Sequence, residues 1–262
     1  MLRFVFTFAF PIAITILPQF GSSPAIAVFT NGEFAIEKPI FFASFSFLHF
    51  STLIVTNLEA PSPSAATLLA KFFKTKEDVF DPIFQTNYKE LWHRGFPIEK
   101  IDSRERLKFI NKKVIVDVQA DFWNGDPDID AICRMEHHPN CKFKDKYFPL
   151  ASNKVSPFNS QNTFISKKVL PHYFLFPHIG RMDDIWASFY VISKGFKVVY
   201  NKASVFQKRN QHDLTKDMLK EFIGYENNLR LIKDLKINVN KINSYIPKRS
   251  RLAFLRYQTH FK

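Results

Sequence analysis

The chain has 262 residues, of which 46% are hydrophobic and 31 are Phe, and its formal net charge is +13. This composition excludes an intrinsically disordered chain, and the length allows one large α/β domain or two small ones with a sizeable core. Two cysteines, Cys133 and Cys141, are too few for a disulfide-framed scaffold, so they leave the cellular compartment open.

The positive charge lies outside the first seventy residues. Residues 1–70 carry two basic and three acidic side chains, a net charge of −1, which leaves +14 for the remainder of the chain. A surplus of this size favours an anionic partner: a phosphate-bearing substrate, a nucleic acid or an acidic membrane face.

The first seventy residues also differ in their apolar patterning. Residues 2–17 are apolar with one basic residue near the start, and Ala25-Ile26-Ala27 has the small-residue spacing that signal peptidase prefers. Residues 39–55 form a second apolar run, roughly 17 residues long against the ~20 that a membrane span needs. Three interpretations of residues 1–70 stay open: a secretory or anchor segment, buried core, or sequence that is not native to the protein.

From Lys71 onward the chain has the mixed charge of a globular domain. The segment W-H-R-G-F-P begins at Trp92, and its glycine and proline predict a turn. Arg94 in that turn offers a planar guanidinium to a carboxylate or a phosphate, although a structural ion pair is an equally simple role. Residues 100–112 are expected to form a solvent-facing helix, and residues 114–118 a buried strand.

Four aspartates follow this strand within ten residues, in the sequence D-F-W-N-G-D-P-D-I-D from Asp121. The position after a strand and before a helix is where α/β proteins place ligand contacts. Asp128 and Asp130 are therefore candidates for binding a substrate through Mg²⁺ or Mn²⁺. The alternative is that one of them caps the helix expected from Ala131.

A Cys and His cluster, C-R-M-E-H-H-P-N-C, comes next. Cys133 and His137 lie four residues apart on the expected helix and could face one zinc ion, with His138 and Cys141 nearby. The spacing matches no established zinc pattern, so a structural role for these residues is the favoured interpretation.

An amide-rich turn and an acidic helix start follow. Asn159, Gln161 and Asn162 carry groups that both donate and accept, which suits sugar hydroxyls or the backbone of a turn. Asp183 and Asp184 precede apolar residues at helical spacing up to Ser193, and Gly195 is expected to end that helix. Strands are expected at residues 163–166, 198–201 and 203–207, and one amphipathic helix at residues 214–236.

The order of these motifs resembles the C-terminal half of a GT-A glycosyltransferase domain. The segments G-D-P-D-I-D-A-I-C-R from Gly125, P-F-N-S-Q-N-T from Pro157 and F-Q-K-R-N-Q-H-D from Phe206 resemble the STELLO-type family of glycosyltransferase-like proteins. W-H-R-G-F-P and G-R-M-D-D-I-W-A, from Trp92 and Gly180, are also similar to the reversibly glycosylated polypeptides, which act as UDP-arabinopyranose mutases. The resemblance covers about residues 80–225.

The resemblance implies an α/β fold of GT-A type, a mixed sheet flanked by helices, over residues 71–235. It implies a UDP-sugar donor, a glycan or protein acceptor and a Mn²⁺ or Mg²⁺ ion. Asp183 or Asp184 would supply the catalytic base or acceptor contact, and His212 would help hold the metal and diphosphate. The resemblance places Asn159 and Asn162 in the turn that approaches the donor sugar or acceptor, and the full set of predicted substrate contacts is Arg94, Asp128, Asp130, Asn159, Gln161, Asn162 and Arg181.

The chain departs from the GT-A pattern in one respect. An Asp-x-Asp metal motif normally ends an N-terminal nucleotide-binding half, and no Asp precedes Asp78 here. We therefore expect either that this half is missing or replaced, or that the metal site has been rebuilt. A non-catalytic glycosyltransferase-like protein that assists a glycan-synthesis complex at a membrane is the alternative function.

Residues 236–262 are basic, with no acidic residue after Asp234, and are expected to form a charged tail. An acidic membrane surface is a partner that such a tail fits, and a nucleic acid is the less favoured one. The expected localisation is membrane-associated, in a Golgi-type lumen if the protein is eukaryotic, or cytoplasmic.

Overall fold

The computed structural model describes residues 66–209 and 213–261, together with five short strands nearer the N-terminus. Those strands are β1 (Phe6–Thr7), β2 (Ala13–Thr15), β3 (Val28–Asn31), β4 (Glu33–Phe34) and β5 (Leu53–Val55). The predicted signal-peptidase segment at residues 25–27 and His212 lie outside the described residues, as do most of the two apolar runs. Among the residues that the structure describes, no helix is long and apolar enough to cross a membrane.

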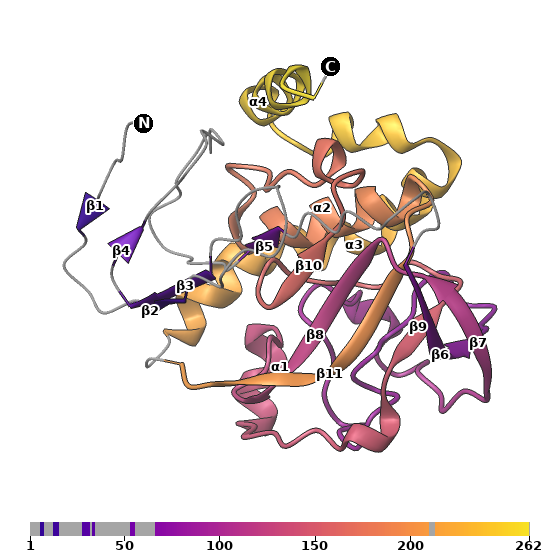
Figure 1. Cartoon of the computed structure of the whole chain (residues 1–262). Helices are drawn as coiled ribbons and strands as arrows, with labels where there is room; N and C mark the ends of the chain where they lie inside the picture. Colours follow the sequence, from indigo (N-terminus) through magenta and orange to yellow (C-terminus); the bar gives the residue numbers. More distant parts are fainter. Residues whose placement is uncertain are drawn as a thin grey trace.

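The protein is an α/β structure built on a mixed seven-stranded sheet with the strand order β5-β10-β8-β11-β9-β6-β7 (Figure 1). β8 runs parallel to β11, and β9 runs parallel to β6, whereas β10 is antiparallel to β8. The strands beyond β5 are β6 (Thr67–Phe73), β7 (Phe109–Ile115), β8 (Val118–Gly125), β9 (Leu150–Ser152), β10 (Thr163–Ile165) and β11 (Val198–Gln207).

In the part of the chain that the structure describes, four α-helices and five 3₁₀ turns accompany the sheet. α1 and α2 both pack on α3, and α4 lies beyond them at one end of the molecule (Figure 1). The helices are α1 (Ala131–His137), α2 (Asp183–Ser193), α3 (Leu214–Ile237) and α4 (Lys248–Thr259). The 3₁₀ turns are η1 (Ile98–Lys100), η2 (Asp145–Tyr147), η3 (Leu170–His172), η4 (Gly180–Met182) and η5 (Val239–Ser244).

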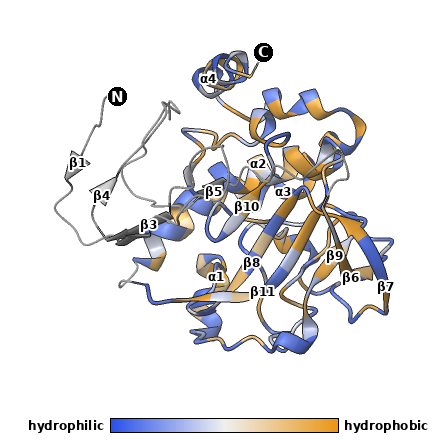
Figure 2. Ribbon diagram, in the orientation of Figure 1, coloured by the Kyte–Doolittle hydropathy of each residue, from blue (hydrophilic) through white to orange (hydrophobic). Residues whose placement is uncertain are grey.

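The core lies mainly on one face of the sheet, because successive residues of a strand point to opposite faces. Leu150 and Tyr200 belong to a large cluster centred on α2, whereas their neighbours Ala151 and Val199 belong to a small cluster on the other face. α2 is buried from Asp184 through Val191, so it is enclosed rather than laid on the surface. The edge strand β7, which has a hydrophilic middle (Figure 2), is exposed at every residue except Val114, whereas the central strand β8 is mostly buried.

Several predicted elements are confirmed: the helices at α1, α2 and α3, and the strand at β10. Gly195 follows α2 with φ +97°, the left-handed conformation expected of a glycine after a helix. The helix predicted for residues 100–112 is wrong, because η1 ends at Lys100 and β7 begins at Phe109. The two strands predicted within residues 198–207 are one strand, β11, whose register with β8 shifts between Asn201 and Val205.

The predicted segment boundaries also differ from the structure. The change of composition near Lys71 falls inside β6, so residues 67–73 belong to the sheet. Residues 236–262 contain the end of α3, then η5 and α4, and Ile242, Ile246 and Phe254 are buried in the main core. The basic residues at this end are therefore carried on a packed helix.

Candidate functional site

The candidate site begins at the W-H-R-G-F-P turn, which is pressed against α2. Gly95 has φ +89°, and a Cβ there would lie 2.3 Å from Ile185 Cγ2, so the turn needs glycine. The Gly95 carbonyl accepts a 3.0 Å hydrogen bond from Asn228 Nδ2 on α3. The Arg94 amide donates to the Asp128 carbonyl at 3.0 Å. These contacts direct the Arg94 side chain between α2 and the loop that follows β8.

Arg94 binds two buried carboxylates at once. Its Nε donates to both Asp128 oxygens, at 3.0 and 3.1 Å, and its two terminal nitrogens donate to the Asp184 oxygens at 3.0 and 3.1 Å. Nη1 also donates to the Arg181 carbonyl. The guanidinium geometry matches a carboxylate in a way that a lysine could not reproduce. Arg94 holds the pKa of Asp128 well below its usual range, against the opposing effect of burial.

The amide-rich turn contributes to the same cluster. Asn159 Nδ2 donates to Asp128 Oδ2 at 2.6 Å, and Ser160 donates to Asp184 Oδ2 from its amide at 3.0 Å and its hydroxyl at 3.2 Å. The turn is held locally by the Gln161 amide, which donates to Asn159 Oδ1 at 3.0 Å. The structure therefore brings together Arg94, Asp128, Asn159 and Asp184, four predicted residues from four separate segments (the Arg94 cluster).

The other two amides of the predicted set lie at the edge of this cluster. Asn162 has φ +50°, and its Nδ2 donates to the Phe122 carbonyl at 3.1 Å and to Ser204 at 2.8 Å, which ties the turn to β8 and β11. Gln161 Oε1 lies 3.4 Å from Arg209 Nη2. Asn162 therefore has a structural role, and Gln161 is half-buried, as Asn162 is.

Asp130 lies outside the cluster and caps α1. Its side chain accepts from the Cys133 amide at 2.9 Å and from Trp92 Nε1 at 2.5 Å. Burial, with the nearby charge of Glu221, raises the pKa of Asp130 to about 7. The capping alternative is confirmed for this residue.

Arg181 points toward α3. Its Nε donates to Glu221 at 2.6 Å, and Nη1 lies 3.2 Å from Asp217. η4 and α3 approach closely there, because Gly180 has φ +62° and a Cβ at that position would lie 2.1 Å from the Lys220 carbonyl. Arg181 contacts the Arg94 cluster through its backbone carbonyl, and the printed contacts of its side chain are with Glu221 and Asp217 on α3, so its predicted role as a substrate contact stays a prediction.

The two aspartates at the start of α2 have different environments. The N-cap residue is Met182, and neither aspartate caps the helix through its side chain in the usual way. Asp184 is buried, whereas Asp183 is half-buried and accepts a 2.9 Å hydrogen bond from the Asp184 amide. Burial, followed by the charge of Asp184, raises the pKa of Asp183 to about 7. A carboxylate with that pKa suits general-base chemistry near neutral pH.

Three further residues at this site were not predicted from the sequence. Arg209, just after β11, lies 3.4 Å from Asp128 and 3.6 Å from Asp126. His93 is buried, which lowers its pKa, and its Nδ1 lies 2.8 Å from the Arg94 carbonyl. The Tyr173 hydroxyl is buried without a hydrogen-bond partner among the described residues, and burial, then Asp184 and Asp183, raises its pKa. Arg209 and His93 lie inside the F-Q-K-R-N-Q-H-D and W-H-R-G-F-P motifs, but neither residue was singled out.

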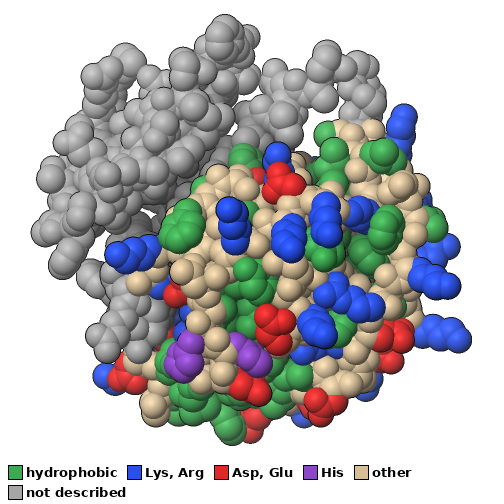
Figure 3. All heavy atoms as spheres, turned by 90° about the horizontal axis from the view of Figure 1, so that it is seen from below, with side chains coloured by type: hydrophobic (Ala, Val, Ile, Leu, Met, Phe, Trp, Pro, Cys, Tyr) green, Lys and Arg blue, Asp and Glu red, His purple; other side chains and the backbone are tan. Residues whose placement is uncertain are grey.

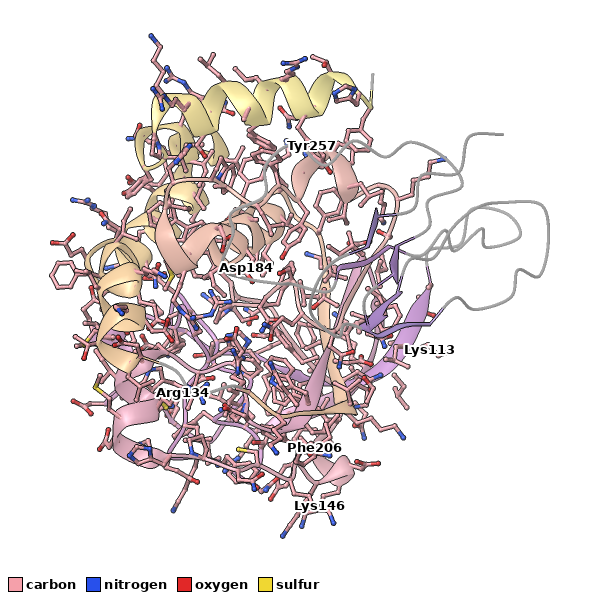
Figure 4. All side chains as sticks on the ribbon, turned by 90° about the vertical axis from the view of Figure 1, so that its left-hand side faces the viewer. Lys113, Arg134, Lys146, Asp184, Phe206 and Tyr257 are labelled. Atoms are coloured by element: carbon pink, nitrogen blue, oxygen red, sulfur yellow. The ribbon has the colours of Figure 1, made fainter. Side chains whose placement is uncertain are left out.

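The site lies where the parallel strands β8 and β11 end, with Asp126 and Asp128 after the first and Arg209 after the second. This is the edge at which open α/β sheets bind ligands. Figure 4 places Asp184 in the interior of the molecule and Arg134, which pairs with Asp126, nearer the surface. The view from below in Figure 3 shows basic, acidic and hydrophobic side chains intermingled on the face, rather than one uniformly basic patch.

The described carboxylates do not fit a divalent ion. Arg94, Asn159 and Arg209 occupy the Asp128 oxygens, while Arg94 and Ser160 occupy those of Asp184. Among residues 66–209 and 213–261, no group of three or more His, Cys, Asp or Glu side chains could hold a metal ion. Cys133 and His137, considered above as zinc ligands, therefore do not belong to such a group. His212, the predicted metal ligand, lies outside the described residues.

Comparison with known proteins adds no family to this description. A scan against models of protein families finds no match, and a search of curated proteins finds none either.

Proposed function

We propose that the protein binds a nucleotide sugar at the ends of β8 and β11 and transfers or rearranges its sugar, as a glycosyltransferase-like enzyme of GT-A type. The observation that carries the proposal is the Arg94 cluster. Four residues predicted from the sequence, two of them (Asn159 and Asp184) through the glycosyltransferase resemblance, lie up to 90 positions apart and meet in one hydrogen-bonded group at the ligand-binding edge of an α/β sheet.

Two residues at this edge have the chemistry that sugar transfer needs. Asp183 has a pKa of about 7, so it can accept a proton from an acceptor hydroxyl as that oxygen attacks the sugar. Arg209 carries a positive charge with longer contacts, at 3.4 and 3.6 Å, and can turn toward a diphosphate leaving group. A Mn²⁺ or Mg²⁺ ion would supply additional charge to the diphosphate, but the described carboxylates do not hold one.

The alternative is a non-catalytic glycosyltransferase-like protein that assists a glycan-synthesis complex at a membrane. One observation favours it: Asp128 and Asp184, two of the implied functional carboxylates, are fully engaged by Arg94, Asn159 and Ser160. Buried charges held in this way are often structural. In this alternative, the cluster keeps the architecture of an ancestral site without its activity.

Ligand-dependent thermal unfolding separates the two functions. A ligand at about 100 times its dissociation constant stabilises the native state by about 2.7 kcal/mol, which for a chain of this size raises Tm by several degrees. We expect UDP-sugars to raise Tm, with and without Mn²⁺, and UDP-sugar turnover to follow. No Tm increase with any UDP-sugar, in either condition, would refute the proposed enzyme and favour the non-catalytic function.

A matched pair of arginine variants localises the binding. Arg209→Gln should remove most of the ligand-induced Tm increase, because it deletes the cation closest to the edge of the site. Arg230→Gln is the control, since Arg230 is exposed on α3 and hydrogen-bonds Asn227 away from the cluster. Equal Tm increases in the two variants would place the nucleotide sugar elsewhere on the protein.

A further inference from the structure

Helix α4 is held to the core by one face. Phe254 is buried, with its ring 5.5 Å from that of Phe174 and 5.5 Å from that of Tyr190. The Tyr257 hydroxyl donates to the Leu170 carbonyl at 2.8 Å. Because the inner face is fixed in this way, the side chains on the outer face keep a constant orientation toward the surroundings.

The outer face combines exposed leucines with cations. Leu252 and Leu255 are 54% and 53% exposed, and their i, i+3 spacing puts them side by side. Lys248, four residues before Leu252, lies on the same stripe, and Arg249 and Arg256 flank it. The sequence therefore places an apolar pair between positive charges on the surface of one helix.

The charges of these cations are not paired within the described part of the chain. None of the four basic residues of α4 forms an ion pair there, and no acidic residue follows Asp234 in the sequence. The basic residues after that position are Lys236, Lys241, Lys248, Arg249, Arg251, Arg256 and Lys262. Lys236 pairs with Asp78, whereas the charges of the four α4 residues are unpaired within the described residues and favour an anionic partner.

We propose that the outer face of α4 binds a lipid surface that carries anionic headgroups. The cations would contact the headgroups, and Leu252 and Leu255 would enter the boundary between headgroups and acyl chains. A nucleic acid would satisfy the cations but would give the two leucines no apolar medium, so the paired leucines favour the lipid.

This attachment leaves the candidate site accessible. Figure 4 shows Tyr257 of α4 at one end of the molecule and Phe206, near the end of β11, at the other. Figure 1 agrees, with α4 far from the end of β11 beside α1. The inference does not depend on the proposed function, because it rests on residues outside the Arg94 cluster.

Vesicle co-sedimentation of the full chain tests the proposal. We expect binding to phosphatidylcholine vesicles that contain phosphatidylserine and much weaker binding to phosphatidylcholine alone, with added salt reducing the first. The double variant Leu252→Ser, Leu255→Ser should lower the affinity for anionic vesicles about tenfold, because it removes the apolar insertion. Lys248→Glu with Arg249→Glu should abolish the preference for phosphatidylserine.

Exposed residues of α3 supply matched controls. Leu219→Ser alters a leucine that is 76% exposed, and Lys233→Glu reverses an exposed charge, both outside the outer face of α4. Both should bind vesicles as the unaltered protein does. All the altered side chains are largely exposed, so each variant should keep its Tm. Absence of binding to anionic vesicles, or undiminished binding by the α4 leucine variant, would overturn the proposal. Tighter binding to single-stranded RNA, with no effect of the leucines, would also overturn it.

Discussion

Two arginines contact the same carboxylate, Asp128, and do so in contrasting ways. Arg94 is buried and donates to Asp128 and Asp184 at 3.0 to 3.1 Å. Arg209 approaches Asp128 at 3.4 Å, and its Nε has no hydrogen-bond partner. Burial and Coulomb attraction also affect them differently: the pKa of Arg94 is raised by its two carboxylates, whereas burial lowers the pKa of Arg209.

The difference separates the part of the site that holds the fold from the part that can respond to a ligand. Arg94 joins α2, the β8 loop and its own turn, so its removal leaves two buried carboxylates without their cation. Arg209 is also enclosed, with 8% of its side chain exposed, but its contacts are longer and its Nε has no hydrogen-bond partner among the described residues. A ligand phosphate could therefore recruit Arg209 without disturbing the contacts that Arg94 makes.

The largest expected effect is on stability, in Arg94→Met. Removing one partner from a buried ion pair costs about 3–5 kcal/mol, because the remaining charge is left unpaired. We expect the free energy of unfolding, measured in urea, to fall by this amount. Lys100→Met is the matched control, since Lys100 pairs with Glu77 at the surface at 2.8 Å, and its loss should change stability little.

The loss of stability at acid pH provides a second measurement on Arg94→Met. Asp128 has a native pKa well below its unfolded value, so its contribution is present above the unfolded pKa and is lost as the pH falls toward the native one. Without Arg94 that depression disappears, and the variant should lose less stability between pH values of about 4 and 2. Equal acid sensitivity in the two proteins would show that Arg94 does not govern the ionisation of Asp128.

The next prediction concerns Asp183→Asn and the activity of the proposed enzyme. If Asp183 is the general base, the variant should lose about 10²- to 10⁴-fold in turnover of a UDP-sugar while still binding it. Asp102→Asn is the control, because Asp102 is exposed in the loop after η1. Unchanged turnover in Asp183→Asn would remove the base from the proposed mechanism and leave the Arg94 cluster as a structural group.

Asp183 also makes a pH prediction that does not require activity. Its native pKa of about 7 exceeds the unfolded value of 3.8, so the native state binds more protons than the unfolded state between these pH values. Ionisation of Asp183 therefore lowers the stability of the unaltered protein as the pH rises from about 4 to 7. Asp183→Asn should be the more stable protein at pH values above about 7, with the advantage vanishing near pH 4.

The sequence predicts the local elements of this fold better than its long-range pairing. α2 and α3 follow from apolar spacing and from Gly195, which are local signals. The segment 100–112 has residues that favour helices, but in the structure β7 is paired along its whole length with β6. That pairing joins residues about forty positions apart, and β6 had been divided by the boundary placed at Lys71.

The same distinction applies to the site. The sequence identifies Asp128, Asn159 and Asp184 as polar groups in positions of interest, but spacing cannot show that one arginine would bind two of them. Arg209 and Tyr173 are missed because each is distinguished by a buried polar atom that has no hydrogen-bond partner among the described residues. Whether a donor or a hydroxyl finds a hydrogen-bond partner depends on how the folded chain packs, so no local sequence pattern predicts it.

Tyr173→Phe is expected to have the smallest effect on stability, and it should stabilise the protein rather than destabilise it. The Tyr173 hydroxyl is buried without a partner, a situation that costs free energy, so its removal should raise the free energy of unfolding by about 1 kcal/mol. Tyr225→Phe is the matched comparison: the Tyr225 hydroxyl donates to Glu221 at 2.7 Å, and its loss should lower stability by about 1.5–3 kcal/mol. If Tyr173→Phe instead weakens UDP-sugar binding at unchanged stability, the hydroxyl contacts the ligand. The part of the site that responds to a ligand then extends from Arg209 to Tyr173. If both tyrosine variants lose stability equally, Tyr173 has a hydrogen-bond partner in solution and belongs with the Arg94 cluster, which holds the fold.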